Sequence, residues 1–306
     1  MTGNAEGRLL VVGAGTMGVQ LALQAATNGI EVELVDPFPE ALERGRAQLA
    51  VLLDRRVSRG RATREQADAV LGRVRLGGDL TAAAAGCDWA IEAVVERLEV
   101  KRQVFAELAA ALPPHAGIAT NSSHIRAELI AGDTDFADRT LNMHYFHPIA
   151  AMDLVEVVAA PATSQQTLEN AVAWAERIGR TPVVLTTAVD GFLVNRVLGA
   201  ASREAFSLLA DGVASFAEID LAVRRGLNWP LGPFQIADLS GLDLLLQSRS
   251  TRFAEHGEAG DRKTVEVVRP LVEAGRLGRK SGAGFYDYST DPPTPLPLPS
   301  ADEAAR

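Results

Sequence analysis

The chain has 306 residues, more than one hydrophobic core usually organises, so its length predicts one large domain and a smaller one. Hydrophobic residues make up 47% and charged residues 23% of it, a balance that excludes disordered and fibrous proteins. The formal net charge of -9 at pH 7 argues against a nucleic-acid partner.

Cysteine, histidine and apolar runs restrict the class of protein further. Cys87 is the only cysteine, so no disulfide can form within the chain, and the five histidines lack metal-ligand spacing. The first apolar run, Leu9–Val12, is too short for a signal peptide or a membrane span, and no later stretch reaches spanning length without charges. We therefore expect a cytoplasmic protein without a metal or a membrane partner.

Short apolar runs alternate with helical patterns over the first 190 residues. Leu9–Val12 leads into glycines and then into a helical pattern that begins near Met17. Further strands are predicted at Val32–Val35, Val74–Leu76, Trp89–Ala93, Ile118–Thr120, Leu141–His144, Leu154–Val158 and Val183–Leu185. Such alternation predicts an α/β domain with a Rossmann-like, doubly wound and mainly parallel sheet.

The strand signal stops after about Gly191. Helical periodicity follows at Asn195–Leu209, Phe216–Arg225 and Leu242–Phe253. We therefore predict a nucleotide-binding domain over residues 1–189 and an all-helical domain over residues 190–289. Five prolines after residue 290 disfavour helix and sheet, so we expect residues 290–306 to form a disordered tail.

A glycine motif directly follows the first predicted strand and opens the first predicted helix. Its residues are Gly13, Ala14, Gly15, Thr16, Met17 and Gly18. The first glycine permits a tight turn, the second lets the backbone approach a pyrophosphate, and the third allows close packing of helix on strand. Asp36 ends the second predicted strand, where a carboxylate can bind both adenosine ribose hydroxyls and would repel a 2′-phosphate. The motif predicts NAD as the cofactor, although glycines alone could merely make a turn.

Beyond this motif, an ordered series of segments resembles the L-3-hydroxyacyl-CoA dehydrogenase family. The resemblance runs from about Leu9 to Tyr288 and is carried by Ile91–Lys101, Thr120–Ser123, His144–Pro148, Leu154–Val158, Asp190–Arg196 and Gly278–Tyr286. It implies a soluble, NAD-dependent oxidoreductase of fatty acid metabolism that forms a homodimer through its helical domain.

Oxidation of a secondary alcohol requires a base for the hydroxyl proton while a hydride leaves the same carbon. His144 is predicted to end a strand at the cofactor crevice and suits that task. Glu156, on an adjacent apolar strand, could accept a hydrogen bond from the other ring nitrogen. The resemblance assigns these residues the same roles. Each could instead be a buried polar residue that serves the fold.

The resemblance also implies further contacts. It places Glu96 and Lys101 near the nicotinamide ribose, Asn121 at the cofactor, and Ser123 and Asn195 on the substrate oxygens. Hydrogen bonds from the last two would position the reacting carbon. Asparagine is also a favoured helix cap, so Asn195 has that alternative role.

Arginines gather after the second predicted strand, in a region that approaches the CoA moiety in the family. They are Arg55, Arg56, Arg59, Arg61 and Arg64. Guanidinium groups suit phosphates, but Asp54 and Glu65 lie nearby in the sequence, and a solvated charged helix is an equal alternative.

Two residues depart from the family pattern beside the predicted site. His147 stands where asparagine is usual, and His124 replaces a second serine after Ser123. Both bear on which acyl group fits.

The main hypothesis is a dehydrogenase of a short-chain 3-hydroxyacyl-CoA, such as 3-hydroxybutyryl-CoA. Three alternatives remain. One is the same chemistry on a thioester of an acyl carrier protein. The second is a dehydrogenase of free hydroxy acids, and the third is an idle NAD-binding structural or regulatory protein.

Overall fold

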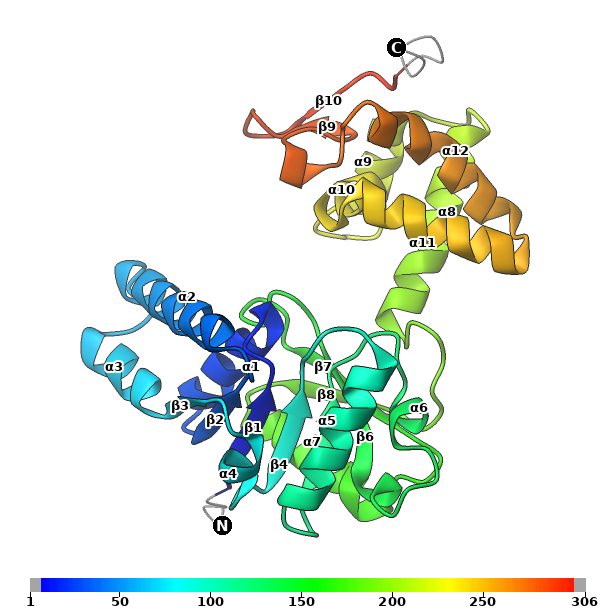
Figure 1. The fold of residues 1–306 in the computed structure, drawn as a ribbon. Coiled ribbons are helices and arrows are strands. Elements are labelled where there is room, and N and C mark those ends of the chain that lie inside the picture. The colour runs from blue at the N-terminus through cyan, green and yellow to red at the C-terminus, as the bar shows by residue number, and fades with distance from the viewer. Residues whose placement is uncertain (1–6, 300–306) are drawn as a thin grey trace. The chain divides into compact units, whose positions relative to one another are not determined.

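The computed structural model describes residues 7–299, which divide into two compact units (Figure 1). The first unit ends at Leu193 and the second begins at Val194, slightly later than the boundary expected between residues 189 and 190. Each unit has hydrophobic clusters of its own.

An eight-stranded sheet forms the centre of the first unit. Its strands are β1 (Leu9–Val12), β2 (Val32–Val35), β3 (Val74–Gly77), β4 (Trp89–Glu92), β5 (Gly117–Thr120), β6 (Thr140–Tyr145), β7 (Leu154–Ala159) and β8 (Thr181–Leu185). They lie in the order β3-β2-β1-β4-β5-β6-β7-β8, and all neighbours are parallel except the antiparallel pair β6 and β7. Most of these strands are buried on both faces, as expected of a mainly parallel sheet covered by helices.

Helices cover both faces of this sheet. They are α1 (Thr16–Thr27), α2 (Pro39–Ser58), α3 (Arg64–Gly72), α4 (Leu80–Ala84), α5 (Leu98–Ala111), α6 (Ala127–Ala131) and α7 (Gln165–Arg177), with a 3-10 turn at Ala137–Arg139. Leu9 and Val11 of β1 belong to the same core cluster as α1, α2, α3 and α7. Leu10 and Val12 point to the opposite face and cluster with α4, α5 and α6. The predicted doubly wound fold is confirmed.

The sheet topology brings several strand ends together. Because β1, β2, β4, β5 and β6 are parallel, their carboxyl ends lie along one edge, and the antiparallel β7 begins there. The strand order reverses between β1 and β4, and open α/β sheets bind ligands at such a switch point. The sequence motifs described above follow these strand ends.

The second unit is mostly helical. Its elements are α8 (Val194–Ala210), α9 (Phe216–Gly226), α10 (Pro233–Ser240), α11 (Leu242–His256), α12 (Ala259–Glu273), a 3-10 turn at Arg279–Ser281, β9 (Tyr286–Asp287) and β10 (Thr294–Pro295). Rings of Phe206, Phe216, Phe234 and Phe285 pack against one another in its core. Buried Asp238 joins α10 to the last segment, since its carboxylate accepts the backbone N–H groups of Phe285 and Tyr286.

The predicted helical character of the second domain is confirmed, apart from the two residues of β9. Residues 290–299 differ from the expected disordered tail, because β10 pairs with β9 and the Leu296 N–H donates to the Phe285 carbonyl at 2.9 Å. Proline lacks a backbone N–H, and it is tolerated at the edge of a sheet because no neighbouring strand requires that N–H there. Residues 300–306 of the expected tail lie outside the described residues.

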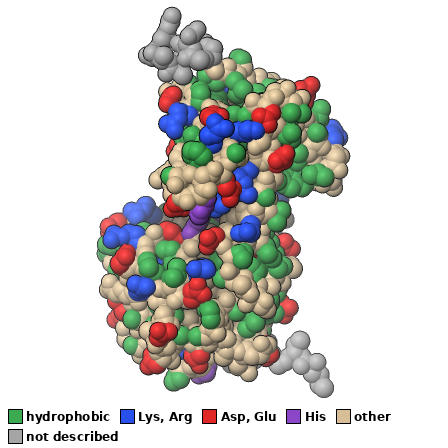
Figure 2. Space-filling view, turned by 90° about the vertical axis from the view of Figure 1, so that its right-hand side faces the viewer, with side chains coloured by type: hydrophobic (Ala, Val, Ile, Leu, Met, Phe, Trp, Pro, Cys, Tyr) green, Lys and Arg blue, Asp and Glu red, His purple; other side chains and the backbone are tan. Residues whose placement is uncertain are grey.

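Surface features of the described residues bear on possible partners. Basic and acidic side chains are interspersed over the face drawn in Figure 2. Within residues 7–299, no helix combines the length and the apolar character that a membrane crossing requires.

Candidate active site

The loop between β1 and α1 shows why two of its glycines are needed. Gly13 has φ +106°, and a Cβ there would lie 2.6 Å from the Ala93 carbonyl oxygen. A Cβ on Gly18 would lie 1.8 Å from the Gly13 carbonyl oxygen. A side chain at either position would therefore separate the loop from β4 or the helix from the loop.

Gly15 has a different environment. A Cβ built on it has no heavy atom within 4 Å, so open space borders the backbone at this point. Gly15 is also the N-cap of α1, and Thr16 and Met17 begin the helix without an acidic side chain in its first turn. The free N–H groups and positive dipole of such a helix end attract a phosphate.

Asp36 lies directly after β2 and beside this loop. Its carboxylate accepts the Ala14 N–H at 2.9 Å and the Phe38 N–H at 3.0 Å. A carboxylate has about four acceptor sites, so two remain for ribose hydroxyls. The open backbone at Gly15 and this oriented carboxylate fit a dinucleotide.

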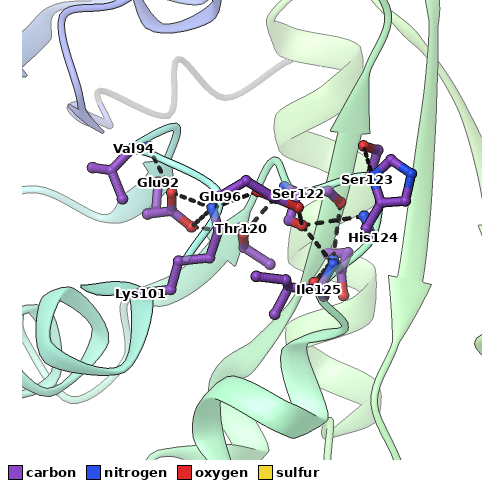
Figure 3. Close-up of polar contacts among 10 residues, drawn as sticks. Glu92, Val94, Glu96, Lys101, Thr120, Ser122, Ser123, His124 and Ile125 are labelled. Carbon is purple, nitrogen blue, oxygen red and sulfur yellow. Dashed lines mark hydrogen bonds and ion pairs between the residues drawn. The ribbon is translucent and has the colours of Figure 1, made fainter. Parts of the chain in front are cut away.

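A buried ion pair stabilises the end of β4 (Figure 3). The side chain of Glu92 is fully buried, and that of Lys101 is 1% exposed. The Lys101 ammonium donates to both Glu92 oxygens, at 2.7 and 3.0 Å. The same carboxylate accepts the Val94 N–H and the Thr120 hydroxyl. Glu92 therefore joins β4, α5 and β5 at the switch point.

Glu96 extends this network toward the surface. Its carboxylate lies 3.2 Å from Lys101 Nζ and accepts a hydrogen bond from the Ser122 hydroxyl. Burial alone would raise the pKa of Glu96, but the Ser122 hydrogen bond and the Lys101 charge together lower it. Glu96 is thus held as an anion, with its side chain 43% exposed.

The segment after β5 is fixed by backbone and side-chain hydrogen bonds. Asn121 Oδ1 accepts the Tyr145 N–H at 2.9 Å, which joins this segment to the end of β6. The Ser122 hydroxyl accepts the N–H groups of His124 and Ile125. Ser123 Oγ lies 2.7 Å from His124 Nδ1, and His124 is exposed.

His144 and Glu156 face one another across β6 and β7. Their backbones are register partners, and His144 Nδ1 lies 2.8 Å from Glu156 Oε2. Glu156 is fully buried, and its other oxygen accepts the Leu193 N–H at 2.9 Å. The side chain of His144 is 8% exposed, and its ring packs against Phe146 and Phe192. Because Nδ1 is engaged with Glu156, Nε2 is the ring nitrogen that can exchange a proton with a ligand.

The remaining predicted residues lie outside the two networks around Glu92 and His144. Asn195 is the second residue of α8, inside the helix and not at its N-cap, so the capping alternative does not hold. It belongs to the second unit. The arginines that were expected near CoA lie at the end of α2 and in the following turn: Arg55, Arg56, Arg59 and Arg61. Arg64 begins α3 and pairs with Asp54 at 2.8 Å. His147 is exposed just after β6.

Sequence reasoning missed Glu92, the acid at the centre of the buried network. Glu92 was taken as part of an apolar strand, and its role in holding Lys101 was not predicted. A charged residue inside an otherwise apolar run is the signal that could have found it, because a buried charge requires a partner. Among residues 7–299, no group of three or more His, Cys, Asp or Glu residues could hold a metal ion.

The fold and this site define a Rossmann-type dehydrogenase, and comparisons with known proteins give the family. Residues 8–188 match the 3-hydroxyacyl-CoA dehydrogenase NAD-binding domain, and residues 191–288 match the C-terminal domain of the same family. The chain belongs to the 3-hydroxyacyl-CoA dehydrogenase family, an NAD-dependent class of oxidoreductases, which confirms the resemblance seen in its motifs.

Several relatives match nearly the whole chain. A probable 3-hydroxybutyryl-CoA dehydrogenase from Bacillus subtilis is 37% identical over 92% of this chain and 97% of its own length. A 3-hydroxyadipyl-CoA dehydrogenase from Escherichia coli is also 37% identical over 92% of this chain, which spans only 59% of that longer protein. The structure of (S)-3-hydroxybutyryl-CoA dehydrogenase from Ralstonia eutropha is 34% identical, with a TM-score of 0.83 over 92% of this chain and 99% of that one.

Proposed function

We propose that this protein catalyses the reversible, NAD-dependent oxidation of the 3-hydroxyl group of a short-chain 3-hydroxyacyl-CoA. The observation that carries the proposal is the buried His144–Glu156 pair, on the same sheet edge as the glycine loop. Such a pair supplies a base at the edge where α/β sheets bind their cofactors.

His144 is the proposed acid–base group. Its Nε2 accepts the hydroxyl proton during oxidation and returns a proton to the ketone oxygen in the reverse direction. NAD, when bound, takes up the hydride from the same carbon. The Nδ1 contact with Glu156 orients the ring and stabilises the imidazolium that forms. The Leu193 N–H in turn fixes the Glu156 carboxylate.

Other residues are proposed to position the two ligands. Gly13, Gly15 and Gly18 admit the pyrophosphate, and Asp36 binds the adenosine ribose. Glu96, Lys101 and Asn121 are assigned to the nicotinamide ribose side, and Ser123 and Asn195 to the substrate oxygens. These assignments rest on the family motifs and on the placement of the first-unit residues at the strand ends.

The proposed substrate is a small acyl thioester of CoA. The similar enzymes named above act, by their names, on 3-hydroxybutyryl-CoA and 3-hydroxyadipyl-CoA, which favours an acyl chain of few carbons. The arginines at the end of α2 are proposed to bind the CoA phosphates, since Arg55, Arg56, Arg59 and Arg61 form no ion pair with other described residues.

Two further properties are proposed. A homodimer is favoured by the helical unit, where Val197, Val213 and Leu227 are each more than three-fifths exposed. A cytoplasmic location is favoured by the cysteine content, since Cys87 is the only cysteine and no disulfide can form within the chain. Sedimentation and cell fractionation would test these two properties.

One comparison of substrates tests the proposed function. NADH oxidation is measured with acetoacetyl-CoA, with acetoacetyl carrier protein and with free acetoacetate at matched concentrations. We expect rapid turnover with the CoA thioester. Preference for the carrier-protein thioester would show that the acyl group is carried by an acyl carrier protein and not by CoA. Activity on the free acid alone, or on none of the three, would contradict the proposal and would favour a different substrate or an idle NAD-binding protein.

A further inference from the structure

The turn that ends the first unit contains a phenylalanine in a conformation that side chains rarely adopt. Phe192 has φ +48°, in the left-handed region, and Gly191 before it has φ +76°. Glycine takes such a conformation without cost, but in other residues the Cβ atom comes too close to the following carbonyl oxygen. For a bulky side chain this conformation is an outlier. The contacts that Phe192 makes must therefore outweigh a local strain.

The ring of Phe192 packs beside the proposed acid–base pair. Its side chain is 1% exposed and belongs to a small apolar cluster with Val158 and Leu185. Val158 lies two residues after Glu156 on β7, so both project from the same face of the sheet. The centroid of the Phe192 ring lies 5.6 Å from that of the His144 imidazole. The ring thus forms an apolar wall beside the imidazole.

The same turn directs a backbone group at Glu156. The Phe192 N–H donates to the Val189 carbonyl at 3.0 Å, which closes the turn. The next N–H, of Leu193, donates to Glu156 Oε1 at 2.9 Å, while Oε2 contacts His144 Nδ1. Because the peptide unit is planar, the backbone angles of Phe192 set the direction of the N–H that follows. Phe192 therefore acts on the imidazole through its ring and on the acid through its backbone.

We propose that Phe192 is a positioning residue for proton transfer. Its ring holds the His144 imidazole against Glu156, and its left-handed backbone directs the Leu193 N–H to the carboxylate. The inference rests on the proposed function, in which His144 exchanges the substrate proton. Without the ring, the imidazole can turn away from the geometry that proton transfer requires. Loss of the ring should therefore lower kcat and leave the binding of both ligands unchanged.

The first test compares Phe192→Leu with the unsubstituted protein. Leucine keeps an apolar side chain in the cluster but removes the ring. We expect kcat for reduction of acetoacetyl-CoA by NADH to fall on the order of tenfold. The KM for the thioester and the dissociation constant for NADH should change by less than about twofold.

Phe105→Leu is the matched control. Phe105 of α5 is fully buried, in the cluster on the opposite face of the sheet. This variant should unfold at a lower urea concentration and keep kcat near the parent value. An equal loss of kcat in Phe105→Leu, or an unchanged kcat in Phe192→Leu, would overturn the inference.

A double-mutant cycle separates positioning from a general loss of packing. Glu156→Gln removes the charge that orients the imidazole, so Phe192→Leu should lower kcat by less than about twofold in that background. Independent effects would multiply instead. A further tenfold loss in the double variant would therefore show that Phe192 does not act through the His144–Glu156 pair, and would overturn the inference.

A comparison of stabilities tests the backbone step. Phe192→Gly and Phe192→Ala both remove the ring, but only glycine adopts a positive φ without strain. The glycine variant should therefore have the higher midpoint of urea unfolding, although glycine usually destabilises relative to alanine. A higher midpoint for the alanine variant would overturn the backbone role.

The outcomes for the proposed function and for this inference are distinguishable. Failure of the unsubstituted protein to reduce the thioester overturns the proposed function and this inference with it. Normal turnover in the unsubstituted protein, together with an unchanged kcat in Phe192→Leu, overturns the inference alone.

Discussion

His144 and Glu156 are register partners on antiparallel strands, with Nδ1 and Oε2 2.8 Å apart and the carboxylate fully buried. Side chains that lie directly opposite in an antiparallel pair project from the same face of the sheet. The connection between β6 and β7 thus brings together two residues that are twelve positions apart in the sequence. The relationship explains how one acid can both anchor the strand pair and orient the imidazole.

Glu156→Gln should separate orientation from cofactor binding. The amide keeps an oxygen for the Leu193 N–H but removes the negative charge beside His144. We expect kcat for ketone reduction to fall on the order of 100-fold, within the range of general acid–base catalysis, while NADH affinity stays unchanged. Steady-state kinetics and fluorescence titration with NADH give the two values. A loss of NADH affinity as large as the loss of kcat would contradict a role of Glu156 that is confined to orienting His144.

Asp36→Ala should chiefly weaken cofactor binding. The substitution removes the acceptor of the Ala14 and Phe38 N–H groups and the proposed ribose contact. We expect the dissociation constant for NAD+ to rise at least tenfold, a loss of about 1.4 kcal/mol, with a smaller effect on kcat at saturating NAD+. Calorimetric titration checks the affinity. Asp68→Ala, an exposed acid on α3, is the matched control and should bind NAD+ normally.

Glu92→Gln tests the buried pair at the switch point. Removal of one charge leaves the Lys101 ammonium buried without its principal counter-ion, which typically costs about 3–5 kcal/mol. Urea unfolding should therefore show a large decrease in the free energy of unfolding. Glu266→Gln breaks the exposed pair with Arg262 and should cost only about 0.3–0.5 kcal/mol. Similar losses for the two variants would mean that the pair does not stabilise the unit as described.

Glu96 predicts a pH dependence whose sign follows from its lowered pKa. An acid that binds its proton less tightly in the folded state contributes stability above its ordinary pKa of 4.5, and this stability is lost as the pH falls through the folded pKa. The difference in unfolding free energy between the unsubstituted protein and Glu96→Gln should therefore be largest near neutrality. This difference should become smaller as the pH is lowered. A difference that grows on acidification would show that the sign is wrong.

The β-strands were the most predictable part of the fold. All eight predicted runs match strands within two residues at each end, because runs such as Leu9–Val12 and Val32–Val35 are buried on both faces. Local pattern was weaker in the second unit, where α10 and α12 were not predicted. Pro233 at the first turn of α10 is a helix-start signal that could have found it, whereas Pro270 inside α12 argues locally against a helix.

The site was predictable where single residues follow strand ends. The hydrogen bond between His144 and Glu156 was expected from their positions and is present. Two pairings that depend on tertiary structure were not foreseen: Glu92 with Lys101, and Ser122 with Glu96. Each joins two segments whose proximity no local periodicity encodes. The roles of the site residues in catalysis stay predictions.

The most direct test of the account is the effect of His144→Gln on turnover and on cofactor affinity, measured together with acetoacetyl-CoA and NADH. The account predicts that kcat falls by a factor on the order of 10² to 10⁴, the usual contribution of a general acid–base group, while the dissociation constant for NADH is unchanged. Retention of turnover near the parent value would contradict the assignment of His144 as the group that exchanges the substrate proton.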